Sequence, residues 1–89
     1  MKKHKKWKRG SIVRIKWVDS AATYGWQRAN TKPSKPSRCE TFGFVIADKK
    51  SHVTVAMNSA GDFGDYGEQM SIPRACITEI TALEPVGGR

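Results

Sequence analysis

Apolar residues recur at every second position in short stretches of this chain, and no stretch keeps them at helical spacing over several turns. The clearest case is SIVRIKWVD, in which Val13, Ile15 and Trp17 fall on one side of an extended chain. Successive side chains of a β-strand point to opposite faces, so the pattern indicates a half-buried strand over residues 11–18. This alternation favours an all-β fold.

A β-hairpin is predicted in the middle of the chain. TFGFVIA and HVTVAM are rich in β-branched and aromatic residues, and the polar tetrad DKKS between them suits a turn. We therefore expect paired strands over residues 41–47 and 52–57. Farther along, NSAGDFGDYGEQ predicts a loop, QMSI a short strand that ends at Pro73, and ACITEITAL one helical turn that runs into a last strand.

The order of these motifs resembles that of small bacteriophage and prophage proteins, mostly of unassigned function. The likeness covers about residues 12–83, from a WVDS turn and a GW pair to an IPRACITEI ending. It rests on Trp17, Asp19, Ser20, Gly25, Trp26, Gly43, Val55, Ala56, Ile72, Pro73, Arg74, Ile77 and Ile80. The strand order, with a proline and a helical turn before the last strand, is also similar to SH3-like and Sm-like small barrels. The resemblance implies such a five-stranded barrel and no catalytic residue.

A barrel of five short strands would bury its apolar residues in one core. The expected inward set is Val13, Ile15, Trp17, Phe42, Phe44, Ile46, Val53, Val55, Met57, Ile72, Ile77, Ile80 and Leu83. The 89 residues have room for one such domain, which we place at residues 11–84. We expect a flexible basic arm at residues 1–10, a long basic loop at 19–40 and a tail at 85–89.

The long loop contains TKPSKPSR, which favours an extended segment of the polyproline type with a basic face. A PxxP ligand for an aromatic groove is the alternative. Tyr24 and Trp26 lie nearer the start of the loop. We expect them to cover an open barrel end as a lid, the alternative being an exposed stacking surface.

Charge divides the chain into a cationic front and a mildly acidic back. Residues 1–38 hold twelve Lys and Arg against one Asp, a net charge of +11, whereas residues 39–89 hold four against seven acids, a net charge of −3. Such asymmetry is typical of proteins that bind nucleic acid or an anionic surface; we expect nucleic acid, because Lys and Arg neutralise phosphates and release counterions, and a solvated basic tail is the alternative. Trp7, among the lysines of MKKHKKWKRG, can stack on an unpaired base or instead pack on the barrel.

The predicted nucleic-acid-binding residues come from the arm, the outward face of the first strand and the loop. They are Lys2, Lys3, Lys5, Lys6, Trp7, Lys8, Arg9, Arg14, Lys16, Trp26, Arg28, Lys32, Lys35 and Arg38. No membrane partner is expected, because the arm has no apolar face and no apolar run approaches the length of a spanning helix.

The inventory of reactive groups predicts no enzyme, no cofactor and no metal site. His4 lies in the basic arm and His52 at a strand start, GDFGDYGEQ lacks the spacing of a calcium loop, and no phosphate-cradling GxxxxGK[ST] occurs. Cys39 and Cys76 belong to no CxxC motif. We expect them to be small core or loop residues in a reducing compartment, with a disulfide or a metal ligand as alternatives.

The sequence thus predicts a non-catalytic phage-type protein that binds nucleic acid through its basic arm and loop. The bacterial cytoplasm is the expected compartment, because no apolar stretch of signal-peptide length follows the basic start. One alternative is an accessory protein that binds a host protein or sequesters a small ligand through GDFGDYGEQ or the loop around Trp26. Another is a structural virion or assembly component.

Overall fold

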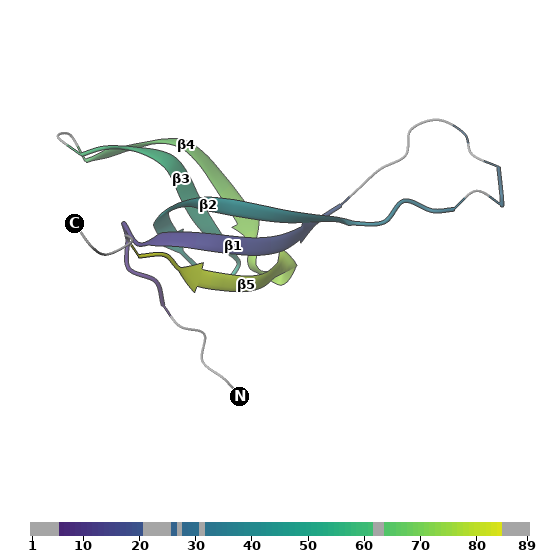
Figure 1. Ribbon diagram of the computed structural model, residues 1–89, viewed down its shortest axis with the longest axis horizontal. Helices are drawn as coiled ribbons and strands as arrows, with labels where there is room; N and C mark the ends of the chain where they lie inside the picture. Colours follow the sequence, from purple (N-terminus) through teal and green to yellow (C-terminus); the bar gives the residue numbers. More distant parts are fainter. Residues whose placement is uncertain (1–5, 21–25, 27, 31, 62–63, 85–89) are drawn as a thin grey trace.

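Five strands and one short helical turn make up the computed structural model, which describes residues 6–20, 26, 28–30, 32–61 and 64–84 (Figure 1). The elements are β1 (Ile12–Asp19), β2 (Ser37–Asp48), β3 (His52–Ala60), β4 (Asp65–Pro73), the 3-10 turn η1 (Arg74–Cys76) and β5 (Ile77–Ala82). Neighbouring strands are antiparallel, in the order β4-β3-β2-β1-β5. The all-β class, the five strands and the helical turn before the last strand are confirmed.

The sheet is open, because its edge strands β4 and β5 do not pair with each other. It bends along β2, which pairs with β1 through residues 37–44 and with β3 through residues 44–48. Figure 1 shows β3 and β4 crossing the direction of β1 and β5. Two layers that share one long strand therefore face each other, as in steeply crossed sheet packings.

The core fills the space between these two layers. Its fully buried residues are Val13, Ile15, Val45, Val53, Val55 and Ile72, and the partly buried Trp7, Trp17, Ile77 and Ile80 pack against them. The inward positions predicted for β1 are therefore confirmed. Two outer members of the predicted set are wrong, because Met57 is 62% and Leu83 37% exposed.

The inward face of β2 is the opposite of the predicted one. Val13 pairs with Gly43 and Ile15 with Thr41, so the odd-numbered residues of β2 share the core face and Val45 is buried. A Cβ atom on Gly43 would lie 2.6 Å from the carbonyl oxygen of Ala56, so β3 passes too close for any side chain there.

Both phenylalanines of β2 lie outside the core for the same reason. Phe42 is 53% exposed, and Phe44 packs at a tilt on Tyr66 of β4, with ring centroids 6.0 Å apart. A bulge between Val45 and Ala47 shifts the register, and Ile46 is only half-buried. The aromatic residues of TFGFVIA therefore cover the outer side of the bend.

The two hairpins differ in how well the sequence predicts them. The β2–β3 hairpin is confirmed, and its turn is closed by the Lys49 amide, which donates to the carbonyl of His52 at 2.9 Å. The expected loop at residues 58–69 is wrong, since β3 continues to Ala60 and β4 begins at Asp65. Gly64 closes that turn with a positive φ of 71° and donates to the carbonyl of Ala60.

Strands β1 and β2 extend farther into the predicted long loop than the alternation indicates. Val18 pairs with Arg38 and Asp19 with Ser37, so the connection between the two strands comprises residues 20–36. Residues 1–5 of the expected arm and residues 85–89 of the expected tail lie outside the described residues.

Candidate nucleic-acid interface

The segment just before β1 is attached to the sheet. The Gly10 amide donates to the carbonyl of Val45 at 2.7 Å, and the Val45 amide donates to the carbonyl of Ser11 at 2.8 Å. Trp7 packs against the core, and its backbone amide donates to Asp48 Oδ2 at 2.8 Å. Trp7 is therefore packed on the sheet, but it is only half-buried and also lines a hollow beside residues 45–49.

Asp48 connects this segment to η1. Its side chain is 3% exposed and accepts a hydrogen bond from the guanidinium of Arg74. Arg74 also donates through Nε to the carbonyl of Lys49 at 3.1 Å, and its amide donates to the carbonyl of Ser51. A buried carboxylate must be paired and hydrogen-bonded, and here both conditions are met by groups that hold three segments together.

The cations of the segment point to water rather than to the core. Lys6, Lys8 and Arg9 are exposed, and the guanidinium of Arg9 lies 5.5 Å from the ring centroid of Tyr66. Such a cation–π contact leaves the charge available to an anion. Lys2, Lys3 and Lys5 fall outside the described residues.

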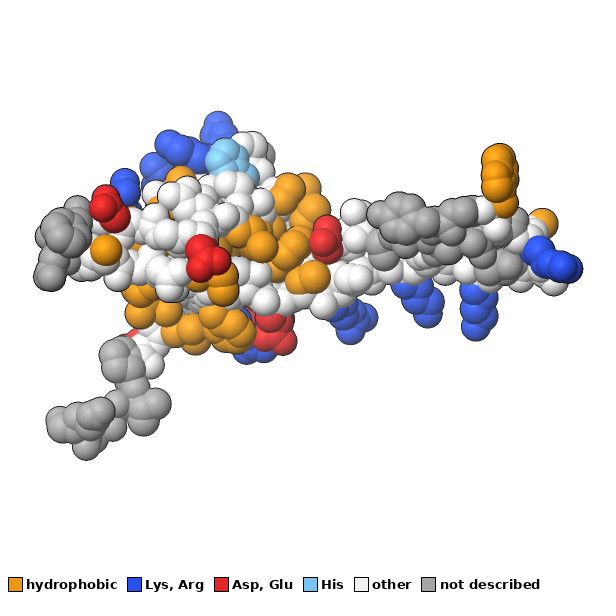
Figure 2. All heavy atoms as spheres, turned by 90° about the horizontal axis from the view of Figure 1, so that it is seen from above, with side chains coloured by type: hydrophobic (Ala, Val, Ile, Leu, Met, Phe, Trp, Pro, Cys, Tyr) orange, Lys and Arg blue, Asp and Glu red, His pale blue; other side chains and the backbone are white. Residues whose placement is uncertain are grey.

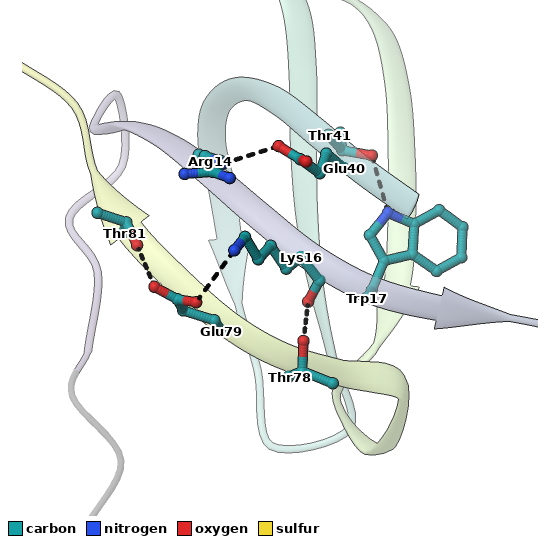
Figure 3. Close-up of polar contacts among 8 residues, drawn as sticks. All are labelled: Arg14, Lys16, Trp17, Glu40, Thr41, Thr78, Glu79 and Thr81. Atoms are coloured by element: carbon teal, nitrogen blue, oxygen red, sulfur yellow. Dashed lines mark hydrogen bonds and ion pairs between the residues drawn. The ribbon is translucent and has the colours of Figure 1, made fainter. Parts of the chain in front are cut away.

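Arg14 and Lys16 face outward on β1 as predicted, but each has an acidic neighbour (Figure 3). Arg14 Nε donates to Glu40 Oε1 of β2 at 2.8 Å, and Lys16 Nζ lies 3.8 Å from Glu79 Oε1 of β5. Thr81 Oγ1 also donates to Glu79 at 3.1 Å. These two cations are therefore partly neutralised within the sheet.

The ion pair with Arg14 changes the pKa of Glu40. The hydrogen bond from Arg14 lowers the pKa of Glu40 below its usual value, and the positive charge of the same guanidinium adds to the effect. Glu40 therefore stays ionised and competes with any external anion for Arg14. A hollow of about 620 Å³ is lined by Lys16 and Arg38 and also by Glu40 and Glu79, of which Glu40 pairs with Arg14 and Glu79 lies near Lys16.

The cations in and next to the β1–β2 connection differ from Arg14 and Lys16 in their ion pairing. Arg28, Lys32, Lys35 and Arg38 are all exposed, and none has an ion pair within the part of the chain that the structure describes. Figure 2 shows Lys and Arg side chains at intervals along this connection, which extends away from the sheet. The sequence from residue 20 to residue 39 contains no acid. Among the described residues, Arg28, Lys32 and Lys35 of the connection and Arg38 at the start of β2 therefore form a strip of positive charge without ion pairs.

Trp26 lies on the same connection and is fully exposed, at 102% relative accessibility. The predicted lid is therefore wrong for Trp26, and the alternative of an exposed stacking surface fits its position. Tyr24 lies outside the described residues. A free indole beside cations is the combination that single-strand-binding surfaces use.

Reactive groups are few among the described residues. Ser51 Oγ and His52 Nδ1 are 2.7 Å apart, but they are sequence neighbours and no described residue is hydrogen-bonded to the other ring nitrogen. Within the same residues no group of three or more His, Cys, Asp or Glu could hold a metal ion. Cys39 and Cys76 are free and half-buried, so they form no disulfide.

Comparisons of the chain with known protein families, curated proteins and solved structures find no match. Across its described residues the chain forms no helix with the length and apolarity that a membrane crossing requires.

Lys49 is a candidate residue that the sequence did not indicate. It lines a hollow together with residues 6–9, although some 40 positions separate them in the chain. The hydrogen bonds of Trp7, Gly10 and Ser11 to β2 help to bring the two segments together. No local pattern in the sequence signals that contact.

Proposed function

We propose that this protein is a non-catalytic module that binds nucleic acid, with the β1–β2 connection as its main contact. The observation that carries the proposal is a strip of exposed cations that have no ion pair among the described residues: Arg28, Lys32 and Lys35 in the connection and Arg38 at the start of β2. Each such cation can neutralise one phosphate and release a counterion. The exposed cations before β1 extend the positive surface.

The two classes of basic residue contribute unequally in this proposal. Arg14 and Lys16 must leave Glu40 and Glu79 before they meet a phosphate, whereas Arg28, Lys32 and Lys35 have no ion pair among the described residues to break. The connection therefore supplies most of the salt-dependent affinity. Contacts of this kind hold the backbone of any sequence, so binding is expected to show little sequence preference.

Trp26 adds a preference for unpaired bases. Its exposed indole has no packing role to lose, and a base stacked on an aromatic side chain contributes about 1 to 3 kcal/mol. Bases of a duplex are already stacked on each other, so they are not free for this contact. Single strands should therefore bind more tightly than duplexes of equal length.

The strand order and the turn before β5 support an SH3-like or Sm-like barrel that is open between β4 and β5 as the finer description of the fold, and the phage-type assignment rests on the sequence motifs alone. In this proposal the sheet serves as a rigid base, and the connection between β1 and β2 is the binding element. Binding and catalytic residues are commonly carried by loops on such scaffolds.

The test is a titration of a labelled single-stranded oligonucleotide at several salt concentrations. The intact protein should lose affinity steeply as salt rises, and the variant K32Q/K35Q/R38Q should lower the log–log slope by about 2 to 3, one step per phosphate contact. Trp26→Ala should weaken single-strand binding without changing the slope. Absence of binding at low salt would refute the proposal and favour the protein-partner alternative.

A further inference from the structure

A hollow of about 410 Å³ separates the segment before β1 from the end of β2. One wall is residues 6–9 and the other is residues 45–49. The segment is hydrogen-bonded to β2 at two points, by the Trp7 amide on Asp48 and by the Gly10 amide on the Val45 carbonyl. Two hydrogen-bonded anchors hold the walls in place, so the hollow is part of the folded chain.

The rim of this hollow is strongly cationic. Lys6, Lys8, Arg9 and Lys49 line it, and all four are exposed. The acid in its lining, Asp48, is 3% exposed and binds Arg74 and the Trp7 amide. The positive charge of the rim is therefore not cancelled from within the lining.

The less exposed part of the lining, which we call the floor, is apolar and partly aromatic. It comprises the half-buried Trp7, Ile46 and Ala47, and the buried Val45 lies beside them in the core. Small-ligand sites combine an apolar surface with a few polar groups that fix orientation, in volumes of about 300 to 1,000 Å³. A ligand that matches both parts has a flat ring for the floor and a phosphate for the rim.

The geometry points to a second binding site in this hollow, for a nucleoside phosphate whose base lies along Trp7 and whose phosphate meets Lys49 and the lysines of residues 6–8. The site deepens the proposed function, on which it rests for the expectation that nucleotides are the natural ligands. It is separate from the β1–β2 connection, because the hollow lies at the last residues of β2 and the connection joins its first.

Two sources supply this chemistry: a free mononucleotide and a nucleotide unit of a bound strand. The experiment therefore has two arms, both read as amide and indole chemical shifts of the full-length protein. One arm adds adenosine 5′-monophosphate, with adenosine as the uncharged control. The other adds a short oligodeoxythymidine.

We expect at least one of the two phosphate probes to shift the signals of residues 6–9 and 45–49, and adenosine to shift them less. Lys49→Glu should weaken that binding about tenfold, because it replaces a charge-assisted contact with a repulsive one. Lys50→Glu is the matched control, since this neighbouring exposed lysine does not line the hollow and should change affinity less than twofold.

A response to the mononucleotide identifies a free-ligand site, and a response to the oligonucleotide alone identifies a strand contact; both support the inference. If neither probe shifts the signals of residues 6–9 and 45–49, the inference is refuted. Equal effects of Lys49→Glu and Lys50→Glu on the affinity refute it as well. If the oligonucleotide shifts residues 32–38 while the hollow stays silent, the inference fails and the proposed function stands.

Discussion

Replacing Gly43 with alanine tests the bend that gives this sheet its core. An added Cβ would lie 2.6 Å from the carbonyl oxygen of Ala56, 3.3 Å from its carbonyl carbon and 3.4 Å from Cβ of Val55. Two of these atoms belong to the backbone of β3, so no side-chain rotation relieves the clash. Strands β2 and β3 must separate beside Val45 and Val55, which are both in the core.

The expected cost follows from overpacking a filled core, about 1 to 3 kcal/mol. For a domain of this size each kcal/mol lowers the thermal midpoint by about 4 to 8 °C, so Gly43→Ala should lower it by about 4 to 24 °C. Urea unfolding should show a lower midpoint with an unchanged slope if the folded architecture is kept.

Gly67→Ala is the control for this experiment. Its added Cβ would meet only Cβ of Asn58, at an ordinary 3.8 Å. The unfolded chain is less flexible with alanine than with glycine at this position, so this variant should be as stable as the parent protein or slightly more stable. If both variants keep the midpoint of the parent protein, the close passage of β3 over Gly43 is refuted.

Three further perturbations have defined outcomes. Trp17→Ala should lower the free energy of unfolding by about 3 kcal/mol, since it removes a packed indole whose Nε1 donates to Thr41 at 2.9 Å, and an unchanged urea midpoint would contradict its place in the core. Trp7→Ala should lower stability by about 2 to 3 kcal/mol and leave the salt dependence of oligonucleotide binding unchanged, whereas a changed slope at full stability would show that Trp7 is not packed. The pKa of Glu40 is lowered in the folded state, so its pairing with Arg14 stabilises the protein above the unfolded-state pKa, and this stabilisation is lost as pH falls through the folded-state pKa. The difference in unfolding free energy between the parent and Glu40→Gln should therefore vanish in acid. A difference that persists in acid would contradict the pairing.

The alternation of the sequence was sufficient for β1, which buries one face and exposes the other, and the β-rich segments around a polar tetrad were sufficient to locate the β2–β3 hairpin. The alternation did not identify the inward face of β2, where the core face carries Thr41, Gly43 and Val45 and the outer face carries the two phenylalanines. Hydrophobic pattern alone favours the larger side chains as the buried ones. The close approach of β3 to Gly43 determines which face of β2 is buried, and it is a contact between segments that are distant in the sequence.

The β3–β4 hairpin was missed for a different reason. Residues 57–60 are all exposed, so this part of β3 needs no apolar alternation and is held by its backbone ladder to β4. Glycines and acids of that composition indicate a loop by propensity. Pairing with a neighbouring strand overrides that propensity.

The candidate site was predicted in its charge but not in its organisation. Net charge located the cationic front of the chain, which includes Lys32, Lys35 and Arg38. It could not separate these free cations from Arg14, whose partner Glu40 lies 26 positions away. That separation depends on the β1–β2 register, and the same register determines which cations are available to a phosphate.

The central claim is that unpaired cations of the β1–β2 connection contact the phosphates, and one matched pair of variants tests it most directly. Lys35→Gln and Lys50→Gln each remove one exposed lysine without an ion pair among the described residues, the first in the connection and the second in the β2–β3 turn. Both change the net charge equally. The measurement is the log–log salt slope of single-strand binding for each variant beside the parent protein.

Lys35→Gln should lower that slope by about 0.7 to 0.9, the loss of one phosphate contact, while Lys50→Gln should leave it within error of the parent value. Equal slopes for the two variants would show that binding senses only the overall charge of the protein. That result would contradict the assignment of the β1–β2 connection as the nucleic-acid interface.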